Sequence, residues 1–85
     1  MPVYVVIGTT GEYSDHREWP VKAYYSKTLA EQHVVNAGRR ANELFVQYGR
    51  YGDVPKGENE YDSKMESAYT GQRYYIWEVE LDATP

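Results

Sequence analysis

The residue types that acid-base catalysis needs gather in one polar segment, Ser14-Asp15-His16 with Glu18. A carboxylate and an imidazole catalyse proton transfer when they reach a specific proton inside a formed pocket. Neighbouring residues on a polar loop are ordinarily solvated, and the sequence shows no nucleophile with a base and an orienting group. We therefore expect no catalytic residues and predict that the protein is not an enzyme.

Metal and cofactor sites are not indicated either. The chain has no cysteine, and its two histidines, His16 and His33, do not have the spacing of a metal site. His33 lies on a predicted apolar helix stripe, where a lone histidine is more often a packed side chain than a ligand. The segment Gly8-Thr9-Thr10-Gly11 lacks the lysine and the following helix of a phosphate-binding loop. We expect no bound metal and no cofactor.

Tyrosine dominates the aromatic composition, with ten tyrosines against two tryptophans and one phenylalanine. A tyrosine ring gives a large apolar area with little side-chain entropy, and its hydroxyl needs a partner, so tyrosines suit recognition surfaces. Aromatic anchors surrounded by carboxylates lie after the first predicted strand and in a long loop. The candidate partner-binding residues are Tyr13, Asp15, His16, Tyr51, Asp53, Glu58, Glu60, Tyr61, Asp62, Glu66 and Tyr69. The alternative is that these tyrosines only hold loops onto the sheet.

The charge distribution favours a basic protein partner over nucleic acid. The net charge is −4, and residues 49–85 carry eight acidic and four basic side chains. Only Arg39-Arg40 forms a local basic cluster, whereas a nucleic-acid binder needs a basic face. An acidic surface steers a basic protein by electrostatic attraction. A small-molecule or nucleotide binding module, with a pocket between the first turn and the long loop, remains as the alternative function.

The strands and the helix that position these residues are expected to form a single α+β domain spanning residues 1–85. Hydrophobic alternation indicates strands at 3–7, 19–25 and 73–82. Pro20 marks either an edge strand or the beginning of the second strand. Residues 49–71 read as one long loop, which we expect to be partly ordered and held by Tyr51, Tyr61, Met65 and Tyr69. The predicted order is β-β-α-β, in a three-stranded antiparallel sheet with the last strand beside the first and one long helix on one face.

The helix is predicted to begin near Lys27 and to end at Gly49. Ser26 and Thr28 precede it, and the Thr28-Leu29-Ala30-Glu31 spacing is that of a capping box, in which a hydroxyl and a carboxylate satisfy backbone N–H groups reciprocally. Apolar residues then recur at three- and four-residue steps over 29–48, as in a helix lying on a sheet. Gly38 within this stripe predicts either close approach to the sheet or a weak point.

The sheet face opposite the helix is a further candidate surface. Alternation puts Trp77 with Tyr75 and Val79 on one face of the last strand, and Trp19 with Val21 and Ala23 on one face of the second. We expect the uncovered face to carry an apolar and aromatic patch larger than monomers usually expose, so either the long loop folds over it or another chain covers it. A homodimer is the commonest symmetric solution. The residues expected there are Tyr4, Val6, Tyr24, Tyr74 and Ile76.

The start of the chain has no basic n-region, and its apolar run is short of the roughly 18 residues that cross a bilayer. We expect a cytoplasmic protein without a membrane segment. The absence of cysteine agrees with a reducing compartment.

Several segments together resemble a family of small uncharacterised proteins of bacteriophages and prophages: Val3-Tyr4-Val5-Val6-Ile7-Gly8, Gly11-Glu12-Tyr13-Ser14-Asp15, Ser26-Lys27-Thr28-Leu29-Ala30-Glu31 and Tyr74-Tyr75-Ile76-Trp77-Glu78-Val79-Glu80-Leu81-Asp82. The resemblance covers most of the chain outside 46–72, and the Gly-Glu-Tyr-Ser-Asp turn is its most specific part. It implies a phage accessory protein and no catalytic residues. Such proteins often act by occupying a surface of a host protein, as anti-CRISPR proteins of similar size and charge do.

Overall fold

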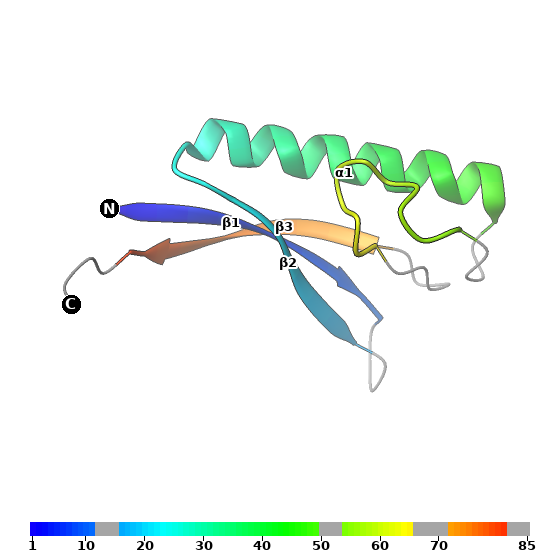
Figure 1. Cartoon of the computed structure of the whole chain (residues 1–85), viewed down its shortest axis with the longest axis horizontal. Coiled ribbons are helices and arrows are strands. Elements are labelled where there is room, and N and C mark those ends of the chain that lie inside the picture. Colours follow the sequence, from blue (N-terminus) through cyan, green and yellow to red (C-terminus); the bar gives the residue numbers. More distant parts are fainter. Residues whose placement is uncertain (12–15, 50–53, 66–71, 82–85) are drawn as a thin grey trace.

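The computed structural model describes residues 1–11, 16–49, 54–65 and 72–81. It contains strand β1 (Pro2–Thr10), strand β2 (Arg17–Tyr24), helix α1 (Lys27–Tyr48) and strand β3 (Gln72–Glu80). The predicted α+β class and the β-β-α-β order are confirmed. Figure 1 shows α1 running along one face of the sheet, close to the direction of β3, whereas β2 slants across at a steeper angle.

The sheet has the order β2-β1-β3, and both outer strands are antiparallel to β1. The prediction that the last strand pairs beside the first is therefore confirmed. The β1–β3 ladder is regular from Pro2 opposite Glu80 to Thr10 opposite Gln72. Because β1 has apolar residues on both faces, it suits the central position.

The ladder between β1 and β2 is broken once. Its register steps from Lys22 opposite Val6 to Pro20 opposite Ile7, which leaves Val21 as an extra residue. The extra residue of such a bulge interrupts the alternation of side chains between the two faces of the strand. The side chains before the bulge therefore lie on the opposite faces from those that alternation predicts.

Trp19 is the residue that this bulge moves. The expectation that it shares a face with Val21 and Ala23 is wrong, because it lies opposite Gly8 on the face of Lys22. Its indole ring covers Gly8 so closely that a Cβ added there would lie 2.6 Å from the ring. The absence of a side chain at Gly8 therefore makes room for the tryptophan.

The helix begins and ends as predicted, but its N-terminal cap differs. The Ser26 hydroxyl accepts a hydrogen bond from the Leu29 N–H at 3.2 Å, so Ser26 is the N-cap and the expected capping box at Thr28 is wrong. At the other end Gly49 has a φ of 99°, which favours glycine. The close approach expected at Gly38 is also wrong, since a Cβ there would meet nothing within 4 Å.

Two segments cover the same face of the sheet. The buried residues of α1 pack on it, and α1 lies mainly over β3. Residues 54–65 lie beside the helix over the region towards β2, and they reach the core through Met65 (Figure 1). The core residues of the described chain are Val6, Ile7, Ala30, Ala37, Ala41, Leu44 and Met65. The other sheet face carries no described helix or loop.

Candidate functional site

The carboxylate of Asp62 lies in the interior, with only 2% of the residue exposed. The Trp19 indole N–H donates to both of its oxygens at 3.1 and 3.0 Å, and the Tyr74 hydroxyl donates at 2.7 Å. The backbone N–H of Lys64 also donates, at 3.1 Å. Hydrogen bonds to an ionised acceptor are stronger than neutral ones, so these donors take the place of water around the charge. Asp62 thereby ties residues 54–65 to both outer strands.

The chemistry of this cluster is structural. Burial, followed by the hydrogen bond to Asp62 and its negative charge, raises the pKa of Tyr74 well above its ordinary value. The hydroxyl therefore stays protonated and acts as a donor near neutral pH. Trp19 is likewise only a donor.

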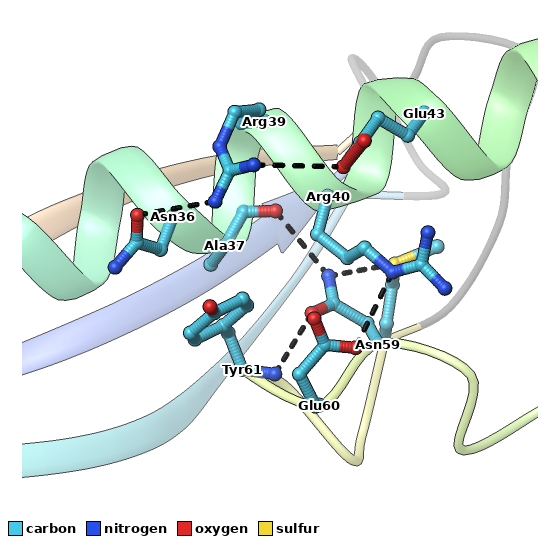
Figure 2. A network of polar contacts seen from close by, with 9 residues as sticks. Asn36, Ala37, Arg39, Arg40, Glu43, Asn59, Glu60 and Tyr61 are labelled. Atoms are coloured by element: carbon cyan, nitrogen blue, oxygen red, sulfur yellow. Dashed lines mark hydrogen bonds and ion pairs between the residues drawn. The ribbon is translucent and has the colours of Figure 1, made fainter.

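Asn59, which is 1% exposed, makes the second attachment of this segment. Its Nδ2 donates to the carbonyl of Ala37 in α1 at 3.3 Å, and its Oδ1 accepts from the backbone N–H of Tyr61 at 2.9 Å. Figure 2 shows the amide between the helix and the loop, with the ion pair between Arg40 and Glu60 beside it. A buried amide with both ends bonded fixes the path of the chain around it.

His33 makes the third attachment. Its Nε2 lies 2.7 Å from the carbonyl oxygen of Tyr61, which can only accept, so Nε2 carries a proton. Its Nδ1 lies 2.8 Å from the Tyr24 hydroxyl and, in the neutral ring, accepts from it. Both ring nitrogens are occupied. The expectation that this histidine is a packed side chain agrees with these contacts.

The structure places the candidate partner-binding residues in different environments. Asp62 is buried and bonded, so its assignment to a contact surface is corrected to an anchoring position. His16, Glu58 and Glu60 are exposed, and Tyr61 is half-buried against the His33 ring. Of the four residues expected to hold the loop, Tyr61 bonds to His33 through its carbonyl and Met65 packs in the core, whereas Tyr51 and Tyr69 lie outside the described residues. Six further candidates lie outside the described residues: Tyr13, Asp15, Tyr51, Asp53, Glu66 and Tyr69.

The described part of the long loop is not uniformly acidic. Lys56 and Lys64 are exposed on it together with Glu58 and Glu60. The two lysines line an open groove of about 350 Å³. The remaining residues of this groove come from the start of β2 and are Arg17, Glu18 and Trp19.

The uncovered face of the sheet exposes apolar side chains among the described residues. It carries Trp77, which is 49% exposed, and Val79, which is 45% exposed, and the rings of Tyr75 and Trp77 are in contact. A groove of about 180 Å³ runs over this face. It is lined by Val5, Ile7, Glu18, Trp19, Pro20 and Trp77.

This face is the opposite one from the face expected to be open. Val6 is fully buried, Tyr74 packs against Ala41 and Leu44, and Tyr24 bonds to His33 of α1. The expected set Tyr4, Val6, Tyr24, Tyr74 and Ile76 therefore belongs to the covered face. Alternation in the last strand did group Tyr75, Trp77 and Val79, but alternation does not say which of two apolar faces a helix covers.

Among residues 1–11, 16–49, 54–65 and 72–81, no group of three or more histidine, aspartate or glutamate side chains could hold a metal ion. Within the same part of the chain, no helix is long and apolar enough to cross a bilayer. No protein-family model, curated protein or solved structure matches the chain.

Proposed function

We propose that this protein catalyses no reaction and acts by binding another protein through the uncovered face of its sheet. The observation that carries the proposal is the apolar groove beside the exposed ring of Trp77. Exposed apolar patches of this kind mark interaction sites, and partly exposed tryptophans are common anchors of interfaces. Asp62, Asn59 and His33 use their polar groups in contacts within the fold. The uncovered face is therefore the better candidate for a binding surface.

The partner that fits is a protein with an apolar side chain for the groove and basic groups around it. Glu18 lies at the rim of the groove, and the whole chain has a net charge of −4. Opposite charge accelerates encounter and orients the partner. The exposed carboxylates of Glu58 and Glu60 add to this field, although Lys56 and Lys64 partly offset it.

The likeness to phage accessory proteins extends the proposal to the identity of the partner. On this proposal the partner is a host protein of the bacterial cytoplasm. The small size and acidic charge of the chain favour a protein that blocks a host defence factor. The binding then works as an anti-CRISPR protein does, by occupation of a surface. Direct binding of nucleic acid is not part of this proposal.

The test is a capture experiment from bacterial lysate at low and high salt, followed by titration of the purified captured protein. Trp77→Thr should abolish capture, because threonine keeps the strand but removes the anchor. Tyr25→Thr is the matched control, since Tyr25 is an exposed aromatic residue outside the sheet. Capture that survives Trp77→Thr, or that Tyr25→Thr abolishes equally, would contradict the proposed surface.

A second candidate function is binding of a nucleotide or another phosphorylated small molecule. The groove lined by Arg17, Lys56 and Lys64 favours it, because it lies between the start of β2 and the long loop and gathers cationic side chains beside the Trp19 ring. Lysine and arginine bind phosphate by charge-assisted hydrogen bonds.

A ligand of this kind would raise the melting temperature, because it binds the folded state only. We expect the shift with ATP at low salt to disappear in the double variant Lys56→Ala with Lys64→Ala. It should persist in Lys27→Ala, which removes an exposed lysine elsewhere. A melting temperature that no nucleotide changes would exclude this candidate and leave the protein-binding proposal untouched.

A further inference from the structure

The outer edge of β3 presents unpaired backbone groups. The N–H of Leu81 donates to the carbonyl of Met1 at 2.9 Å, so this pair is hydrogen-bonded. Hydrogen-bonded and non-bonded pairs alternate along an antiparallel ladder. In the regular β1–β3 register the backbone groups of Trp77 therefore point towards β1, and those of Tyr74, Ile76 and Glu78 point outward. No described residue pairs with them.

The two edges of the sheet differ in how they are protected. The edge strand β2 contains Pro20 and the bulge at Val21, two features that prevent another strand from pairing. The nine-residue strand β3 contains no proline and no break in register. An unprotected regular edge of this length is a template for addition of a further strand.

The helix presents a compatible flank above this edge. His33 and Arg40 contact residues 54–65, so their side of α1 faces towards β2. At 100° per residue, the buried stripe with Ala37 and Ala41 separates this side from the other flank. That flank carries Val34, Gly38 and Phe45 and faces the outer edge of β3. Glycine in a helix interior costs up to about 1 kcal/mol relative to alanine. No contact of Gly38 with the described residues explains it, because a Cβ there would meet nothing within 4 Å.

We propose that a second copy of this chain pairs with the β3 edge, antiparallel about a two-fold axis at Ile76, to form one continuous six-stranded sheet. In this register Ile76 lies opposite its copy, Tyr75 lies opposite Trp77, and Tyr74 lies opposite Glu78. No like charges oppose one another, whereas an axis at Glu78 would set two carboxylates face to face. The sequence of β3 is thus complementary to itself in this register.

The helix position agrees with the same axis. Tyr74 packs against the cluster of Ala41 and Leu44, and Ile76 lies about 7 Å further along β3. At a rise of about 1.5 Å per residue, this places Ile76 below the part of α1 around Gly38. Paired β3 strands lie about 4.8 Å apart and packed helices 8–10 Å apart, so the two copies of α1 come side by side there. The missing side chain of Gly38 permits that approach.

A second copy brings a second contact besides the paired strands, because the flank of α1 with Val34 and Phe45 meets its own copy beside the axis. The open faces of the two copies then join into one surface with both Trp77 rings near the axis. This inference does not depend on the proposed partner, because it concerns the free protein.

Sedimentation equilibrium of the full chain across a concentration series tests the inference. We expect a dimer, and we expect Glu78→Pro to raise the dissociation constant about tenfold or more, because proline removes an outward N–H that β1 does not use. Glu78→Thr is the matched control, since it removes the same charge, keeps the N–H and should leave the dimer intact. A monomer at every concentration would overturn the proposal, as would equal dimerisation of both variants.

A second variant decides the matter if Glu78→Pro fails to fold. Gly38→Gln adds a good helix former where the single chain has open space, so the monomer should melt no lower than the wild type. In the dimer the new side chain lies between the helices, and the dissociation constant should rise about tenfold or more. Val46→Gln on the exposed side of α1 is its control. An unchanged dimer in Gly38→Gln would refute the proposed geometry.

Discussion

Replacing Asp62 by alanine removes the acceptor that donors from β2, β3 and its own loop share. The Trp19 indole and the Tyr74 hydroxyl lose their partner in a part-buried site, and the N–H of Lys64 loses its own. A hydrogen bond to a charged group contributes about 1.5–3 kcal/mol, and a buried donor left unpaired carries its full desolvation cost. Water can reach Lys64 more readily than the two rings. We therefore expect the free energy of unfolding to fall by about 3–5 kcal/mol.

That loss is large for a chain of this length. At about 0.05–0.15 kcal/mol per residue, the total stability is of the order of 4–13 kcal/mol. For a domain of this size each kcal/mol corresponds to about 4–8 °C in melting temperature, so Asp62→Ala should melt at least about 12 °C lower. Urea unfolding followed by circular dichroism measures the free energy, and a thermal scan measures the melting temperature.

Glu60→Ala is the matched control, because it removes an exposed carboxylate two residues away that pairs with Arg40. Exposed ion pairs contribute about 0–1 kcal/mol, so this variant should behave almost as the wild type. A loss below about 1 kcal/mol in Asp62→Ala, or an equal loss in both variants, would refute the view that the buried carboxylate holds the loop.

Three further changes test the same packing. Gly8→Ala should lower the free energy of unfolding in urea by about 1–3 kcal/mol, because the added methyl group displaces the Trp19 ring; an unchanged value would contradict that contact. Tyr74→Phe should reduce the fall in the free energy of unfolding at alkaline pH. The pKa of Tyr74 is raised in the folded state, so on raising the pH the tyrosine loses its proton first in the unfolded state. The wild type therefore keeps its stability below about pH 10 and loses it as the pH rises further. If this reasoning failed, the wild type and Tyr74→Phe would lose the same free energy of unfolding between pH 8 and pH 11. Asn59→Ala should cost about 1–3 kcal/mol and speed amide exchange at Tyr61, and slow exchange there would speak against it.

The sequence by itself determined the local features of this protein. Alternating apolar residues located the three strands, and apolar residues at helical spacing together with Ser26 and Gly49 located the helix and its ends. Both patterns reflect contacts and backbone preferences within a few residues, which the sequence displays directly. The apolar character of both faces of β1 agrees with its central place in the sheet.

Only the tertiary structure decided which sheet face is covered and which side chains form the interior polar contacts. Two sheet faces of similar hydrophobicity do not indicate which one a helix will cover. In the structure α1 and residues 54–65 pack on the face that carries Val6. The bulge at Val21 then moved Trp19 to that face, where Asp62 meets it across more than forty positions of the chain. The burial of a carboxylate depends on donors that come from distant strands, so its environment exists only once the sheet, the helix and the loop have packed together.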